Sequence, residues 1–115
     1  MKIVRSADVP PQPVTEEGAR NATIRWLISR PEGAPTFAMR LLEVAPGGST
    51  PLHDHGWEHE VYILEGEVEF VSDAGPRPVS AGDAVFIPPG ERHQLRNAGE
   101  TLARFLCMIP LPEQD

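Results

Sequence analysis

Short runs of apolar residues, each ended by glycine, proline or polar residues, recur along this chain of 115 residues. Several runs alternate apolar and polar positions, as strands with one buried face do, and none keeps a helical period for the length of an ordinary helix. The pattern therefore predicts a series of short strands joined by turns. They are expected at residues 2–5, 23–29, 37–44, 49–55, 59–64, 68–72, 78–79, 84–87, 93–96 and 102–109.

Turn residues mark most of the predicted strand ends. The run Pro46, Gly47 and Gly48 is expected to stop the strand at 37–44, and a second proline–glycine cluster follows residues 84–87. Thirteen prolines and ten glycines in so short a chain argue against long helices. We predict an all-β sandwich, jelly roll or barrel, preceded by a polar, proline-bearing arm over residues 1–22.

Composition narrows the class of protein. The length suits residues 1–115 forming a single domain, since a second hydrophobic core would need more chain. The formal net charge of -7 and the absence of a basic run argue against nucleic acid or anionic membrane as a partner. A single cysteine and the absence of a long apolar segment favour a reducing, cytoplasmic location.

The four histidines carry the clearest chemical signal. His53 and His55 are two residues apart in a predicted extended segment, so both side chains are expected on one face. His59 follows after three residues, and a barrel would bring the distant His93 back beside them. Imidazole is a strong ligand for first-row transition metals, so we predict that the histidines jointly bind one divalent ion.

Two segments around these histidines resemble the motifs of the cupin superfamily. Residues 47–66 read GGSTPLHDHGWEHEVYILEG and carry the first motif, with HxH at its centre and glycine at both ends. Residues 82–97 read GDAVFIPPGERHQLRN and carry the second motif complete, with PxG, histidine and asparagine. The resemblance implies a double-stranded β-helix, or jelly-roll barrel, with a metal site inside it.

The first motif departs from the usual cupin pattern at one ligand position. The motif has six residues between this ligand and the closing glycine, and that gap before Gly66 places His59 at the position where most cupins have glutamate. The resemblance is therefore closest to small manganese-type cupins with four histidine ligands, His53, His55, His59 and His93. Glu60 is the fallback ligand, and Glu58 or Glu60 could instead orient a histidine ring. Manganese is the expected ion, with Fe, Ni, Cu and Zn as alternatives.

A site of four neutral imidazoles leaves the ion its full charge and should attract a small anionic or enolisable ligand. The resemblance turns one face of residues 102–109 toward the metal. Arg40 could anchor an anion or form a salt bridge elsewhere, and Cys107 could be an inert buried thiol or an oxidisable one. The predicted pocket residues are Thr50, Trp57, Leu95, Phe105, Cys107, Ile109 and Arg40.

Three functions fit these predictions. The first is a metal-dependent oxidoreductase of the dioxygenase type, using two open positions beside four histidines. The second is a non-catalytic module that binds or senses a small ligand. The third is a metal-assisted isomerase or lyase, which would need a proton shuttle such as Glu58, Glu60 or Tyr62. A small cupin has exposed sheet edges, so we also expect a homodimer in which residues 8–13 cross over.

Overall fold

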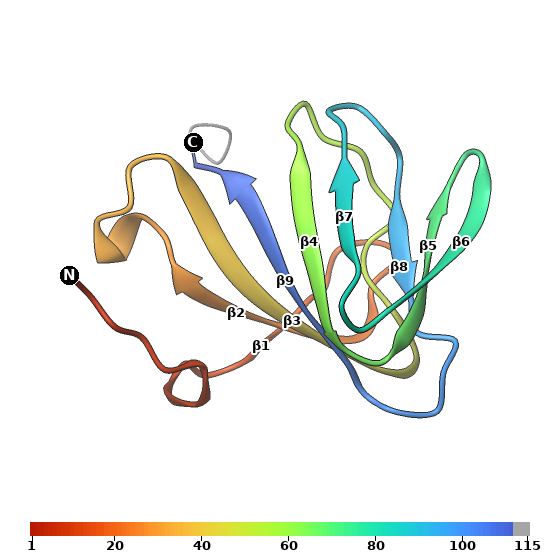
Figure 1. The fold of residues 1–115 in the computed structure, drawn as a ribbon, viewed down its shortest axis with the longest axis horizontal. Helices are drawn as coiled ribbons and strands as arrows, with labels where there is room; N and C mark the ends of the chain where they lie inside the picture. The colour runs from red at the N-terminus through yellow and green to blue at the C-terminus, as the bar shows by residue number, and fades with distance from the viewer. Residues whose placement is uncertain (112–115) are drawn as a thin grey trace.

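The computed structural model describes residues 1–111, which form one curled antiparallel sheet with no α-helix among them (Figure 1). Two short 3-10 turns cover Ser6–Asp8 and Arg30–Glu32. The predicted all-β class is confirmed. The strands are β1 (Gln12–Pro13), β2 (Arg20–Ile28), β3 (Phe37–Ser49), β4 (His59–Glu65), β5 (Glu67–Ser72), β6 (Gly75–Ser80), β7 (Ala84–Ile87), β8 (Gln94–Arg96) and β9 (Ala103–Pro110).

The order of hydrogen-bonded strands is β6-β5-β8-β3-β9-β4-β7. Outside this order, β2 pairs with both β1 and β3. β3 joins the two halves of the curl, since it pairs with β2 and β9 along most of its length and with β8 at Ser49. Its pairing with β2 shifts register between Ala22 and Arg20, so the strand bulges and bends there. Gly48 permits this bend, because a Cβ at that position would lie 2.5 Å from the Arg20 carbonyl oxygen.

The structure corrects three of the predicted elements. Of the strand predicted at 49–55, only Ser49 lies in a strand, as the end of β3, and His53 forms an isolated bridge with His93. Residues 2–5 form no strand, and the first strand is Gln12–Pro13, which pairs with β2 of its own chain. Pro46, Gly47 and Gly48 do not end β3, because the bulge lets the strand continue through them to Ser49. Exchange of the arm with a second copy stays a prediction.

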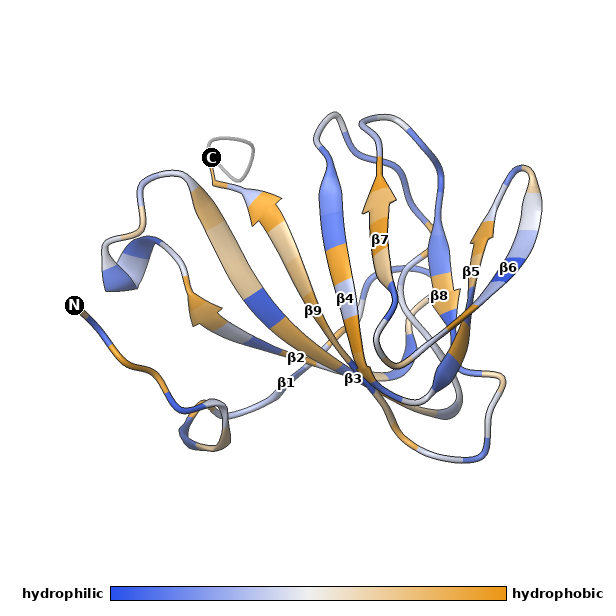
Figure 2. Ribbon diagram, in the orientation of Figure 1, coloured by the Kyte–Doolittle hydropathy of each residue, from blue (hydrophilic) through white to orange (hydrophobic). Residues whose placement is uncertain are grey.

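Alternation along the strands builds the core. In β9, Ala103, Phe105, Cys107 and Ile109 are buried, and the residues between them are partly exposed. β7 and β9 are predominantly hydrophobic in Figure 2. No helix in the described part of the chain is long and apolar enough to cross a membrane.

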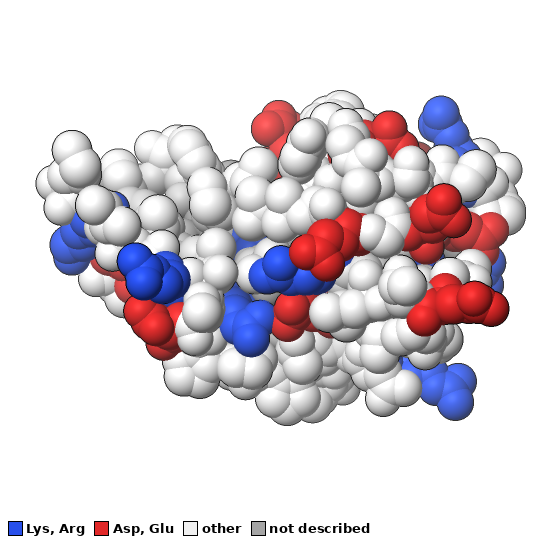
Figure 3. Space-filling view, turned by 60° about the horizontal axis from the view of Figure 1, so that its bottom comes forward, with Lys and Arg blue, Asp and Glu red and all other residues white. Residues whose placement is uncertain are grey.

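The opposite face of the same strands carries an ion-pair network. Glu43 on β3 accepts hydrogen bonds from Arg25 at 2.6 Å and from Arg104 at 2.9 Å. Arg104 also donates to Glu65 at 3.2 Å. Figure 3 shows basic and acidic side chains in contact near the middle of one face of the molecule. On this side of the sheet, the arginines are therefore matched by carboxylates.

Candidate metal centre

A pair of backbone hydrogen bonds places His53 opposite His93. The His93 amide donates to the His53 carbonyl at 2.9 Å, and the His53 amide donates back at 3.2 Å. Directly opposed residues of an antiparallel pair project from the same face of the sheet. The bridge therefore brings His53 of the first motif beside His93 of the second, although the two are 40 positions apart in the sequence.

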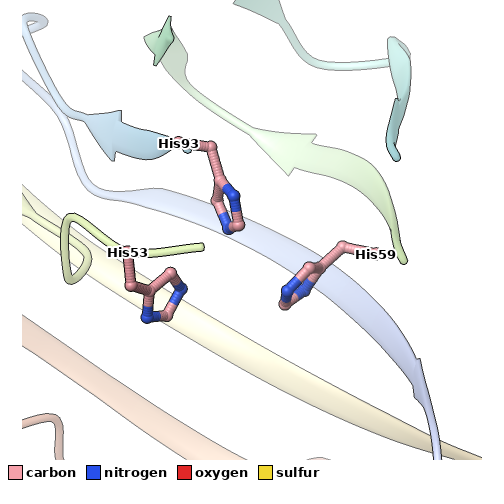
Figure 4. A group of neighbouring side chains, drawn as sticks. All are labelled: His53, His59 and His93. Carbon is pink, nitrogen blue, oxygen red and sulfur yellow. The ribbon is translucent and has the colours of Figure 1, made fainter. Parts of the chain in front are cut away.

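His59 completes a group of three. It begins β4 opposite Ile87 of β7, and it is 5% exposed. One ring nitrogen from each of His53, His59 and His93 lies within 4.8 Å of the others. The three side chains come from separate segments and point toward one common space (Figure 4).

His55 lies directly beside this group of three. Its ring stacks on Trp57 at a centroid distance of 4.2 Å, and its Nε2 lies 3.2 Å from the Nε2 of His53. The Gly90 amide donates a hydrogen bond to the carbonyl of His55, which ties this loop to the turn that precedes His93. The four rings therefore form one cluster, with centroid separations from 4.0 to 6.2 Å.

Contacts on the far side of two rings fix which nitrogen faces the centre. Nδ1 of His93 lies 2.9 Å from the Glu91 carbonyl oxygen, which can only accept, so this nitrogen carries the proton. Nδ1 of His59 lies 3.3 Å from the Cys107 sulfur. The Nε2 of His59 is then buried without a hydrogen-bond partner. Such an arrangement is typical of metal ligands, whose other ring nitrogen is held by a neighbouring group.

The surroundings favour the neutral form of three of the imidazoles, those of His53, His55 and His59. Burial lowers the pKa of His59 to about 3, and the positive charges of His93 and Arg40 act in the same direction. Burial likewise lowers the pKa of His53 to about 4, with help from His55 and His93. The pKa of His55 is also lowered, first by burial. Neutral imidazole is the form that binds a metal, so these residues suit a divalent ion at neutral pH.

A pocket opens beside the histidines, and the predicted pocket residues all line it. Most of the remaining wall is apolar and includes Leu42, Phe70 and Ile87. Arg40 and Trp57 each have a buried side-chain nitrogen, Nε and Nε1, without a hydrogen-bond partner. The predicted set in this pocket is Thr50, Trp57, Leu95, Phe105, Cys107, Ile109 and Arg40.

Glu58 and Glu60 are placed elsewhere. Alternation along β4 turns Glu60 away from His59, and both glutamates line a separate surface groove with Phe37 and Met108. Within residues 1–111, neither is hydrogen-bonded to a histidine ring. The prediction was that Glu58 or Glu60 would orient a histidine ring. The groups that contact the outer ring nitrogens are instead the Glu91 carbonyl, at His93, and the Cys107 sulfur, at His59.

Glu16 and Trp26 are among the pocket residues that were not predicted from the sequence. Glu16, in the loop after β1, lines the pocket and places a carboxylate oxygen 3.6 Å from Nδ1 of His53. Trp26 on β2 lines the pocket beside Arg40. Alternation in residues 23–29 puts Ile24, Trp26 and Ile28 on one face and could have found Trp26, but nothing local to Glu16 marks it.

Comparison with known proteins identifies the architecture. Residues 40–109 match the cupin domain family. The polyketide cyclase RemF from Streptomyces resistomycificus superimposes with a TM-score of 0.91 and 44% sequence identity, over 96% of this chain and 80% of that chain. An oxalate-binding protein of Thermotoga maritima is 34% identical over 95% of this chain and 93% of its own length.

Proposed function

This chain belongs to the cupin family, and from that premise we propose that it binds one divalent ion through four histidines and uses it to activate a small, oxygen-rich anionic ligand. The observation that carries the proposal is the group of His53, His59 and His93, with a buried, unpartnered Nε2 on His59. A buried polar atom without a partner is costly, and a bound ion would satisfy it.

The position of His55 supports it as the fourth ligand. Two nitrogens bonded to one ion at right angles, at about 2.1 Å each, lie roughly 3 Å apart. The Nε2 atoms of His53 and His55 are separated by 3.2 Å, which matches that arrangement closely. We propose manganese as the ion, and Fe, Ni, Cu and Zn are the alternatives that imidazole ligands also suit.

The charge of the site favours anionic ligands. Four neutral imidazoles would leave a divalent ion uncompensated, and Arg40 adds a further positive charge to the same pocket. The names of both relatives point to matching chemistry. Oxalate is a dianion that offers two oxygens to a metal, and a polyketide carries β-dicarbonyl groups whose enolates also offer two oxygens.

We favour non-oxidative carbonyl chemistry, such as the cyclisation of a β-dicarbonyl compound, as the reaction. A bound divalent ion supplies Lewis-acid polarisation of a carbonyl group. The apolar wall would exclude water from the polarised carbonyl, and Glu16 supplies the carboxylate for proton transfer that the sequence analysis did not find. The likeness to a polyketide cyclase supports this reaction class.

Dioxygenase-type oxidation is the second candidate. If a six-coordinate ion is bound by four histidines, two positions remain for a substrate and dioxygen. The largely apolar pocket wall also fits a site that must protect reactive oxygen species from side reactions.

Oxygen dependence separates the two reactions. Metal-loaded protein would be incubated with linear β-polycarbonyl compounds in air and under strict anaerobiosis, with products identified by mass spectrometry and oxygen uptake followed in parallel. We expect dehydrated cyclic products in equal yield under both conditions. Turnover that stops without oxygen would replace the cyclase proposal by the dioxygenase one, and the absence of turnover in both would contradict both.

A further inference from the structure

Arg40 occupies a fixed place on the inner face of the sheet. It pairs in register with Trp26 on β2 and with Cys107 on β9, so the three side chains form one row across three strands. Its guanidinium carbon lies 5.2 Å from the Trp26 ring centroid, within the range of a cation–π contact. Its Nη2 lies 2.9 Å from the Cys107 sulfur. The two neighbours therefore hold the guanidinium in one orientation.

The charge of this arginine is not compensated within residues 1–111. No Asp or Glu in that range forms an ion pair with Arg40, whereas Arg25 and Arg104 on the other face both pair with Glu43. The Nε of Arg40 is buried and has no hydrogen-bond partner. A partly buried cation without a counter-charge costs folding free energy, which an anionic ligand would recover on binding.

Arg40 also lies next to the histidine group. The Cys107 sulfur contacts Nη2 of Arg40 on one side and Nδ1 of His59, at 3.3 Å, on the other. A single atom therefore bridges the guanidinium and a proposed metal ligand. Both residues line the same pocket, so a small molecule held at the histidines can reach Arg40.

We propose that Arg40 is a second anchor for the ligand and selects compounds that carry a carboxylate beyond the two oxygens bound at the metal. The inference rests on the proposed function, since it assumes that the ligand is held at the histidine site. Donors remain for the carboxylate, because Nη2 donates to the Cys107 sulfur and no other guanidinium nitrogen of Arg40 is hydrogen-bonded within residues 1–111. The preferred substrate class is then a β-dicarbonyl acid rather than a neutral β-dicarbonyl compound.

Two related probes test this selectivity. Acetylacetone and acetylpyruvate share the β-dicarbonyl group, and only acetylpyruvate has a carboxylate. Their dissociation constants would be measured by titration calorimetry on Mn²⁺-loaded protein. We expect Arg40→Gln to weaken acetylpyruvate about tenfold or more, the usual size for a charge-assisted hydrogen bond. Binding of acetylacetone should change less than about twofold, and metal content should not change.

Matched variants separate anchoring from general effects. Arg104→Gln removes an arginine from the other face and should alter neither dissociation constant. Arg40→Lys keeps the charge and should recover part of the acetylpyruvate affinity. If Arg40→Gln weakens both probes equally, or neither, the anchoring role is wrong while the metal-site proposal stands. If the wild-type protein binds neither probe, the proposed function fails and the inference fails with it.

Discussion

The two faces of the curled sheet differ in whether their arginines are paired with carboxylates. On one face, Glu43 lies between Arg25 and Arg104, and each arginine finds a carboxylate. On the other face, Arg40 touches a thiol and an aromatic ring, and nitrogens of Arg40, Trp57 and His59 are buried without partners. Polar groups that are hydrogen-bonded to one another need no further partner. Polar groups that are left without partners in a pocket can be satisfied by a ligand, and here Arg40, Trp57 and His59 all line the pocket that contains the other histidines.

The largest expected effect comes from removing one histidine of the inner face. His59→Ala should lower metal affinity by more than about 100-fold, because even residues that only support a ligand change affinity by roughly 10–100-fold. Glu60→Ala is the matched control on the same strand, since Glu60 faces the other way. Metal content after gel filtration measures both variants. Loss of metal from Glu60→Ala and retention by His59→Ala would reverse the assignment.

A smaller effect is expected on the folding stability of the metal-free protein at acidic pH. The unfolded chain takes up protons on its histidines below a pKa of about 6.5, whereas folding lowers the pKa of His53 to about 4 and that of His59 to about 3. More protons are bound by the unfolded state in this interval, so stability falls as pH falls. We expect a loss of roughly 2 kcal/mol between pH 6.5 and 4.5, allowing for partial exposure of His53.

Urea unfolding of chelator-treated protein across this pH range measures the loss. A double variant, His53→Asn with His59→Asn, should show a flatter profile, because two of the three histidines with a lowered pKa are gone. An unchanged slope in that variant would show that the acid sensitivity arises elsewhere in the chain.

The smallest expected effects are on the free energy of unfolding when one arginine from each face is replaced. Arg104→Met should lower the free energy of unfolding by up to about 1 kcal/mol, since it breaks partly exposed ion pairs. Arg40→Met in the metal-free protein should leave stability unchanged or raise it slightly, because it removes a charge without a counter-charge. Chemical denaturation of both variants gives the two values. A larger loss for Arg40→Met would mean that Arg40 is a structural residue.

Much of the fold could be predicted because strand alternation and turn residues act locally. The positions of β4, β7 and β9 follow from their apolar patterns, to within a residue or two at each end. The extent of β3 could not be predicted in this way. Its continuation through Pro46, Gly47 and Gly48 depends on pairing with β2 and β8, which are distant in the sequence.

The candidate site was also predicted from the sequence only in part, for the same reason. The sequence by itself determined the all-β class and the spacing of the four histidines, because the period of a strand decides which neighbours share a face. Only the tertiary structure decided that His53 lies opposite His93, that Cys107 rather than a glutamate contacts His59, and that Glu16 reaches the pocket. It also decided that Arg40 lies between Trp26 and Cys107 without a carboxylate. Such contacts join strands that are far apart in the chain, and no local pattern encodes which side chains meet across them.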